Sequence, residues 1–258
     1  MVFDKPQTVN TLANDPASQA TGFLSQINVL FKGKATVTDG KFRFEFKVPK
    51  DINFQYGKGK ISYYAENGTT DGGDYFNEFI VGGSSTVTDN DREGPVIKAW
   101  LNDEKFVNGG ITNETPVLIL KLSDSSGINT SGTGIGHDIS ITVDNDNNRF
   151  FILNDYYEAD IDNYRQGVVR FQLPAFEPGL HTIKIRVWDV LNNSSEIILD
   201  FNVANDEDLV INHVLNYPNP FTTRTQFWFE HNKPGQDLSV QIHIYSLTGR
   251  TIKTIKKQ

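Results

Sequence analysis

Alternation of apolar and polar residues at every second position is the feature that most constrains this sequence. Residues 41–48 show it without a fault, with three phenylalanines and one valine on one face and charged residues between them. A period of two matches a half-buried β-strand, whereas an amphipathic helix repeats every 3.6 residues. Similar runs recur along the whole chain, which has 258 residues. The sequence therefore predicts an all-β protein made of tandem immunoglobulin-like β-sandwich domains and an incomplete C-terminal β-domain.

The first predicted domain covers residues 1–85 and begins within a sandwich whose start is missing. Its strands are expected at 2–5, 27–37, 41–48, 61–65 and 75–81. Asp39 and Gly40 supply a hairpin turn before the alternating run at 41–48. Helix is scarce, because only residues 11–26 have room for a turn or two and Pro16 and Gly22 interrupt them.

Two further domains are predicted, at residues 92–204 and 212–258. A small, polar, acidic linker at 82–95 precedes the second domain, and residues 205–208 mark the next linker. Strands in the second domain are expected at 96–101, 116–122, 138–143, 150–153, 168–173, 181–188 and 196–203. The third domain offers only 225–230, 239–245 and 251–255, too few strands to close a sandwich of about seven. We therefore expect it to be truncated.

Composition excludes several classes of function. The chain has a net charge of −8, which disfavours a nucleic-acid partner. It contains no cysteine, so it has no disulfide, no thiolate metal site and no cysteine nucleophile. The N-terminus lacks the basic and apolar regions of a signal peptide, and no stretch approaches the ~20 apolar residues of a membrane helix. We expect a fragment of a longer chain.

Two short motifs near the C-terminus carry the strongest functional signal. The first contains two prolines one residue apart, which remove two N–H donors and exclude a central strand. The motifs are Asn216, Tyr217, Pro218, Asn219, Pro220 and Phe221, followed by Leu247, Thr248, Gly249 and Arg250. In this order they resemble the start of the C-terminal sorting domain of proteins exported by the type IX secretion system of Bacteroidetes-type bacteria. The resemblance implies an exported protein at the outer-membrane surface or outside the cell.

Stretches ahead of these motifs resemble the region after the peptidase domain of the type IX secretion sortase, a gingipain-like cysteine peptidase. They lie at 30–33, 48–52, 56–61, 122–129, 132–137 and 187–195. The resemblance implies a parent that cleaves sorting domains from secreted cargo with a cysteine paired to a histidine. Neither role can be placed on this chain, which has no cysteine. The chain is expected to be non-catalytic, with the parent's other domains and the secretion machinery as partners.

The neighbours His137 and Asp138 are the only tempting catalytic pair. Residues adjacent on a strand point to opposite faces, so an aspartate at this position cannot orient the histidine ring. The sequence also lacks a Gly-x-Ser-x-Gly elbow. A structural histidine is favoured here, and no catalytic residue is predicted.

No cofactor is predicted from the sequence, and calcium is the one that its acidic residues leave open. Asp89, Asp91 and Glu93 alternate in the linker before the second domain, and Asp124 and Asp189 lie at strand ends. Hard cations take six to eight oxygen ligands, often carboxylates that converge where modules meet. The simpler interpretation is a solvated acidic linker, with Asp124 and Asp189 capping turns through the backbone. The acidic run 144–148 is interpreted as a hairpin turn.

A second functional hypothesis is a carbohydrate-binding or adhesion segment of another type IX-secreted surface protein. Exposed aromatic side chains stack on sugar rings, whereas aromatics in small sandwiches usually fill cores and seams. The candidate platform comprises Trp100, Trp188, Trp228, Tyr156, Tyr157 and Tyr164. Sequence alone leaves both hypotheses open.

Overall fold

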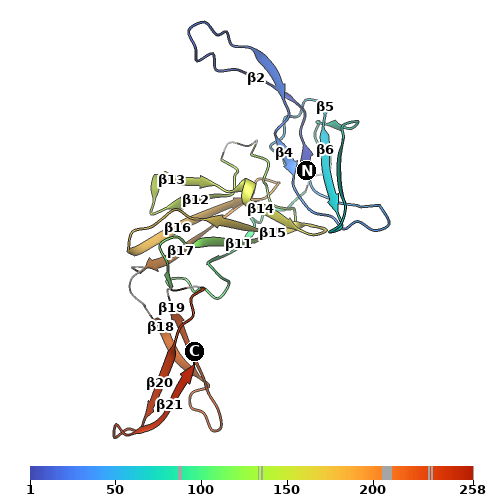
Figure 1. Cartoon of the computed structure of the whole chain (residues 1–258). Coiled ribbons are helices and arrows are strands. Elements are labelled where there is room, and N and C mark those ends of the chain that lie inside the picture. Colours follow the sequence, from blue (N-terminus) through green and yellow to red (C-terminus); the bar gives the residue numbers. More distant parts are fainter. Residues whose placement is uncertain are drawn as a thin grey trace.

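The computed structural model describes residues 1–86, 89–132, 134, 136–204, 211–231, 233 and 235–257. Among these residues there is no α-helix; one short 3-10 turn, η1 (Asn154–Tyr156), interrupts a structure otherwise made of strands and loops. Figure 1 shows three parts in chain order, which we call the N-terminal region (1–86), the central sandwich (96–204) and the C-terminal hairpins (211–257). The all-β prediction is confirmed. The expected linker at 205–208 lies outside the described residues.

The N-terminal region is built on one antiparallel sheet of order β4-β1-β6-β7. Its strands are β1 (Val2–Phe3), β2 (Gln7–Asn10), β3 (Gly22–Ser25), β4 (Val29–Phe31), β5 (Gly57–Lys58), β6 (Lys60–Glu66), β7 (Asp71–Phe76) and β8 (Ile80–Val81). Its buried apolar core is small: Val2, Leu30, Ile52 and Val81, with partly buried aromatics packed against them. A core of this size gives the region little hydrophobic stabilisation of its own.

Residues 11–26, the one stretch with room for a helical turn, contain no helix. β2 and β3 pair as an antiparallel hairpin, with Val9 opposite Phe23, and residues 11–21 form its tip. The hairpin projects away from the rest of the N-terminal region (Figure 1). The physical reason is local, because Pro16 and Gly22 oppose helix while the flanking residues pair across the turn.

The most regular alternation in the sequence, residues 41–48, does not form a paired strand. The predicted turn is present, since Thr38 and Lys41 exchange two backbone hydrogen bonds around Asp39 and Gly40, both at positive φ. Beyond Lys41, however, residues 42–48 join no sheet. Rings two residues apart stack 6.2–6.3 Å from each other, close to the ~6.6 Å that two extended residues span. The segment is therefore strand-like but lacks a neighbour.

The central sandwich packs two sheets face to face. Their orders are β10-β17-β16-β12-β13 and β14-β15-β11-β9. The strands are β9 (Val96–Leu101), β10 (Ile111–Thr112), β11 (Val117–Ser123), β12 (Ser140–Val143), β13 (Asp146–Ile152), β14 (Tyr157–Asp160), β15 (Asn163–Gln172), β16 (Gly179–Trp188) and β17 (Ser194–Val203). Inward residues of both sheets, such as Leu120 and Ile185, form one buried cluster. The acidic run after β12 begins with a two-residue hairpin turn at Asp144 and Asn145, as expected.

The C-terminal hairpins are two separate antiparallel pairs. β18 (Ile211–Tyr217) pairs with β19 (Gln226–His231), and β20 (Val240–Tyr245) pairs with β21 (Thr251–Lys257). Asn212 has no assigned burial class, and none of the other residues described in this part of the chain is buried. β18 was not predicted. It is a strand in addition to the three expected in this region, and Asn216 and Tyr217 lie at its end.

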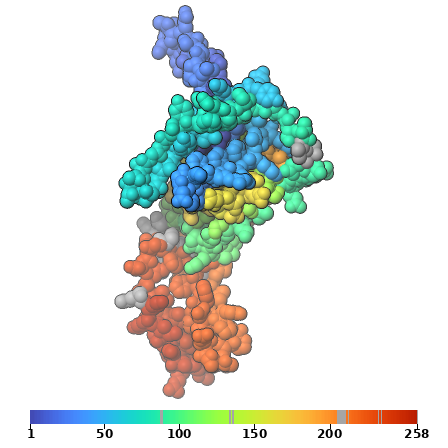
Figure 2. Space-filling view, turned by 90° about the vertical axis from the view of Figure 1, so that its right-hand side faces the viewer, coloured from blue at the N-terminus to red at the C-terminus, as the bar shows by residue number. Residues whose placement is uncertain are grey.

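The N-terminal region is docked on the central sandwich along a polar seam. Figure 2 shows the blue and cyan atoms of this region lying on the yellow and green surface of the sandwich. At one end Lys34 pairs with Glu158 at 2.7 Å, and the Thr36 amide donates to Asp162 Oδ1 at 2.8 Å. At the other end the Lys50 amide donates to the Val190 carbonyl. These contacts fix residues 47–51 against the sandwich end where the predicted acidic residues lie.

Candidate functional site

Three aspartates converge where the linker, β11 and β16 meet. Asp91 lies in the linker, Asp124 directly follows β11, and Asp189 directly follows β16. Each offers a carboxylate oxygen, and the three oxygens lie within 4.8 Å of one another. Sheet topology explains the approach, because the ends of β11 and β16 open at the same end of the sandwich.

Asp189 is fully buried and organises the turn that follows β16. Its Oδ1 accepts hydrogen bonds from the backbone amides of Leu191 (2.9 Å) and Asn193 (2.6 Å), and its Oδ2 accepts one from Asn193 Nδ2 at 2.8 Å. Burial raises the pKa of the Asp189 carboxyl, and the Asp91 charge raises it further. The predicted turn-capping role is therefore present.

Asp124 caps the neighbouring turn in the same way. Its Oδ1 accepts the amides of Ser126 (2.7 Å) and Gly127 (3.2 Å). Burial raises the pKa of this carboxyl, and the nearby charges of Asp189 and Asp91 add to the effect. Folding therefore disfavours the ionised form of two of the three carboxylates, Asp124 and Asp189.

Asp91 differs because hydroxyl groups solvate it. Its Oδ2 accepts hydrogen bonds from Ser126 Oγ and Ser125 Oγ, both at 2.7 Å, and its Oδ1 accepts the Glu93 amide at 3.1 Å. The two serine hydroxyls, Ser126 first, lower the pKa of Asp91 to about 2. This carboxylate therefore stays ionised to a lower pH than an ordinary aspartate.

The other two predicted linker ligands lie outside this group. Asp89 pairs with Lys47 Nζ and accepts the Asp91 amide, and the Lys47 contact lowers the pKa of its carboxyl. Glu93 is not part of the group, although it lines a pocket of about 410 Å³ with Asp124 and Arg165. Of the predicted residues, the structure gathers Asp91, Asp124 and Asp189 and leaves Asp89 and Glu93 apart. A hard cation such as calcium would find carboxylate and serine oxygens at the gathered group.

His137 is a seam residue. Its Nδ1 lies 2.8 Å from Asp51 Oδ2, and its ring contacts Trp188 in a tilted arrangement, with centroids 4.2 Å apart and planes at 35°. Asp138 faces elsewhere and accepts Asn154 Nδ2 at 2.7 Å. The neighbours therefore point apart, as expected from their adjacency, and the histidine joins the N-terminal region to the sandwich.

Asp51 is the residue of this seam that sequence reasoning missed. Besides His137, it accepts Asn129 Nδ2 at 3.1 Å and Asn192 Nδ2 at 2.9 Å. These partners lie 78 to 141 positions away in the sequence. No local pattern can reveal such a set of contacts, because only the docked regions bring it together.

The two C-terminal motifs occupy connections in the C-terminal hairpins. Residues 218–221 lie between β18 and β19, where Thr225 Oγ1 donates to the Pro218 carbonyl at 2.9 Å. Residues 247–250 form the turn between β20 and β21, with Gly249 at positive φ and Leu247 fully exposed. The prolines therefore fall outside the strands, as predicted, and both motifs face solvent.

The predicted aromatic platform is not assembled. Tyr157 is buried, Trp188 is half-buried against His137, and Trp228 lies on β19 among the C-terminal hairpins. Trp100 lies on β9 with Lys121 Nζ 5.9 Å from its ring centroid. These side chains are dispersed over two parts of the molecule and offer no common stacking surface.

Comparisons with known proteins give a similarity among solved structures. No protein-family model matches the chain, and no curated protein matches it. Among solved structures, it is similar to dimeric latent PorU from Porphyromonas gingivalis, with 32% sequence identity and a TM-score of 0.46. The similarity covers 99% of this chain and 24% of that one, so the chain spans about a quarter of that protein. None of the described segments forms a helix long and apolar enough to cross a membrane.

Proposed function

We propose that this chain is a non-catalytic C-terminal β-sandwich region of an exported gingipain-like sortase. In this proposal residues 1–85 and 92–204 are structural and interaction domains, and residues 212–258 belong to a type IX sorting domain. Processing of secreted cargo by cysteine peptidase or transpeptidase chemistry is assigned to the parent protein, at the outer-membrane surface or outside the cell. The partners are the parent's other domains and the type IX secretion machinery.

One observation carries the proposal: both sorting-type motifs lie on exposed connections and not in a core. Phe221 is 51% exposed and Leu247 is fully exposed, although both are large and apolar. Packing within this chain does not explain these residues. Exposed apolar side chains on ordered turns are typical of surfaces to which a partner protein binds.

The lack of cysteine in this chain supports the same assignment. The sequence contains no cysteine, and His137 is engaged by Asp51 and Trp188 at the seam. A histidine that joins two regions of the fold is positioned by that contact and not toward a nucleophile. A carbohydrate-binding or adhesion segment remains the alternative, and the dispersed aromatic side chains give it no specific observation.

The experiment that tests the proposal is secretion of the parent protein in a type IX-competent bacterium. The first motif is replaced at three positions, with Tyr217→Ala, Pro218→Ala and Phe221→Ala in one variant. We expect this variant to accumulate in the periplasm while the unaltered protein reaches the cell surface, as followed by fractionation and surface protease treatment.

A matched control changes exposed residues of the same hairpins outside the motifs, with Tyr245→Ala and Ile252→Ala. The control variant should reach the surface normally. Normal surface delivery of the motif variant, or equal retention of both variants, would contradict the sorting role.

A further inference from the structure

The chain contains two asparagines that are followed directly by glycine. They are Asn67, before Gly68, and Asn108, before Gly109, and all four residues are exposed. Such an asparagine can lose its side-chain amide, because glycine has no side chain to hinder the approach of its backbone nitrogen to the asparagine side chain. Since the two sites share the same pair of residues, their surroundings in the fold can be compared directly.

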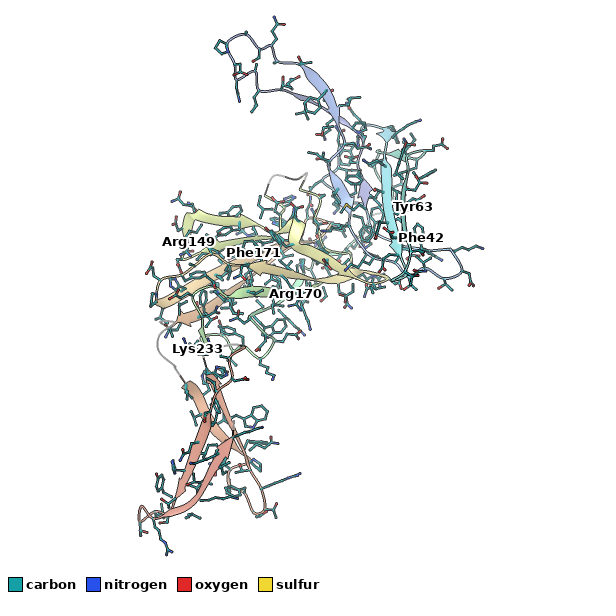
Figure 3. All side chains as sticks on the ribbon, in the orientation of Figure 1. Phe42, Tyr63, Arg149, Arg170, Phe171 and Lys233 are labelled. Carbon is teal, nitrogen blue, oxygen red and sulfur yellow. The ribbon has the colours of Figure 1, made fainter. Side chains whose placement is uncertain are left out.

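Asn67 and Gly68 lie in the turn between β6 and β7. Tyr63 of β6, labelled in Figure 3, lies on the strand that leads into this turn. The Asn67 amide donates to the Thr70 carbonyl at 3.1 Å, and Gly68 has a φ of 83°. Glycine adopts this left-handed conformation without strain. The backbone of the turn is therefore ordered by its own contacts.

Four donors surround the side-chain oxygen of Asn67. Its Oδ1 accepts hydrogen bonds from the backbone amides of Thr69 (3.1 Å) and Thr70 (2.9 Å) and from the hydroxyls of the same two residues (2.8 and 3.2 Å). Donors gathered on a carbonyl oxygen stabilise the negative charge that develops there when a nucleophile attacks the carbon. The side-chain carbonyl of Asn67 is therefore polarised toward attack.

A carboxylate contacts the nitrogen that would attack. The Gly68 amide donates to Glu66 Oε2 at 2.7 Å. An amide nitrogen must give up its proton in order to attack, and a carboxylate in hydrogen-bond contact can take that proton as a general base. Because the two residues are adjacent, Gly68 N and Asn67 Cγ are held close enough to close a five-membered ring.

Asn108 and Gly109 have different partners. The Gly109 amide donates to the Asp200 carbonyl at 2.8 Å, and Asn108 Oδ1 accepts the Asp200 amide at 2.7 Å. A backbone carbonyl is too weak a base to take the amide proton, and ring closure would pull both groups away from β17. The fold therefore holds Asn108 in an unreactive arrangement.

We propose that Asn67 is a site of spontaneous deamidation, with Glu66 as the general base and the Thr69 and Thr70 donors stabilising the developing charge. Gly68 N bonds to Asn67 Cγ while its proton passes to Glu66. The bond from Cγ to Nδ2 then breaks, and Nδ2 leaves as ammonia with that proton, which leaves a cyclic imide. Water opens the imide at either carbonyl and gives aspartate or isoaspartate.

The reaction changes the edge of the N-terminal sheet. The product carries a new negative charge beside Glu66 and Asp71, which face each other across the hairpin. Isoaspartate also lengthens the backbone of the turn by one carbon. β7 is the last strand in its sheet, next to β6, so a distorted turn loosens this edge. This site goes beyond the sorting role, because it lies in the N-terminal region and uses none of the C-terminal motifs.

The test uses the full 258-residue chain, incubated at neutral pH. Peptide mapping by mass spectrometry follows the conversion of amide to acid at each site, and an isoaspartate methyltransferase labels the isoaspartate product. We expect Asn67 to convert at least about ten-fold faster than Asn108 in the folded protein. In concentrated urea the two rates should be similar. No conversion of Asn67, equal rates in the folded protein, or the same excess in urea would overturn the proposal.

A variant of the base separates this geometry from simple exposure. Glu66→Gln can still accept the Gly68 amide but cannot take its proton, so Asn67 should convert at least about five-fold more slowly. The matched control, Glu78→Gln, changes an exposed carboxylate of the same region outside the turn and should leave the rate unchanged. An unchanged rate in Glu66→Gln, or equal slowing in Glu78→Gln, would refute the role of the base.

A pair of variants tests the donors on Asn67. Thr69→Val removes one hydroxyl and keeps the backbone amide, whereas Thr69→Ser keeps both donors. Conversion of Asn67 should be several-fold slower in Thr69→Val and unchanged in Thr69→Ser. Circular dichroism melting confirms that each variant is folded, and equal rates in the two folded variants would contradict the contribution of the hydroxyl.

Discussion

At the scale of single residues, carboxylates hold the ends of the central sandwich together. Asp124 and Asp189 each satisfy backbone amides of the turn that follows their strand. Asp51 plays a similar role across the seam, where it accepts hydrogen bonds from the Asn129 and Asn192 side chains. Buried donors left without such acceptors would cost the fold more than the hydrogen bonds themselves contribute.

The first prediction concerns Asp189→Ala. The substitution removes three hydrogen bonds from a fully buried position and leaves the amides of Leu191 and Asn193 without an acceptor. We expect a loss of about 2–4 kcal/mol in the free energy of unfolding, measured by urea denaturation. Asp155→Ala, at an exposed carboxylate, should stay within about 0.5 kcal/mol of the unaltered protein. Equal effects of the two substitutions would contradict the capping role.

The second prediction concerns pH. The pKa of Asp124 is raised by burial, then by the charges of Asp189 and Asp91, so the folded state binds a proton more readily than the unfolded chain. Stability from this group therefore falls as pH rises from the ordinary carboxyl pKa through the raised value. Asp124→Asn removes that loss and keeps an acceptor for the Ser126 amide. The variant should gain stability relative to the unaltered protein as pH rises above about 4, the ordinary carboxyl pKa, measured without metal; a difference that stays constant with pH would contradict the prediction.

The third prediction concerns calcium and its ligands. The sequence predicts Asp89, Asp91 and Glu93, whereas the structure gathers Asp91 with Asp124 and Asp189. We expect calcium to raise the melting temperature and a chelator to reverse the change; binding at 100 times Kd adds about 2.7 kcal/mol. Asp124→Asn should abolish the response and Glu93→Gln should retain it. Identical melting curves with calcium and with chelator would leave only the turn-capping role.

At the scale of elements, pairing partners decide which alternating segments become strands. β12 and β16 alternate and pair, with Ile141 opposite Ile185 in the sandwich core. Residues 42–48 alternate as regularly and remain single. The C-terminal hairpins pair only within themselves, and no residue with an assigned burial class in them is buried. Two-stranded hairpins of this kind are marginally stable in water.

The fourth prediction follows from this contrast between elements. Amides of β18–β21 should exchange with solvent far faster than amides of β11, β12 and β16, because local opening of an unburied hairpin costs little free energy. Hydrogen exchange followed by mass spectrometry measures the difference on the intact chain. Equal protection in the C-terminal hairpins and in the sandwich strands would show that the hairpins are covered by a further contact.

At the scale of the whole molecule, one large core supports a smaller region through polar contacts. The sandwich core contains residues from both sheets, whereas the N-terminal core has four buried apolar residues. The seam between them is made of hydrogen bonds and ion pairs, including Lys34 with Glu158 and Asp51 with His137. Exposed pairs contribute little individually, so the N-terminal region depends on several of them together.

The fifth prediction tests this dependence with two fragments. Residues 92–204 alone should unfold cooperatively on heating, because the sandwich retains both of its sheets and its core. Residues 1–85 alone should show no cooperative transition, since the small core loses the seam contacts of Asp51 and Lys34. Circular dichroism melting of the fragments and the full chain measures both outcomes. A cooperative transition in the isolated N-terminal fragment would contradict the dependence.

The sequence by itself determined the all-β class, the hairpin turn at Asp39 and Gly40, and most strands of the central sandwich. These features depend on side-chain alternation and on residues that accept positive φ, which are local properties. It also indicated that Asp124 and Asp189 cap turns, because an aspartate at a strand end bonds amides a few residues away.

Only the tertiary structure decided which residues meet. The sequence predicted a strand at 41–48, but a ladder needs a neighbouring backbone, and the described chain places none beside residues 42–48. It grouped Asp91 with Asp89 and Glu93 because they are adjacent, whereas sheet packing brings Asp91 to Asp124 and Asp189. Asp51 gained its partners only when the N-terminal region docked on the sandwich. Contacts between distant segments arise from the packing of the folded chain, which a local sequence pattern does not specify.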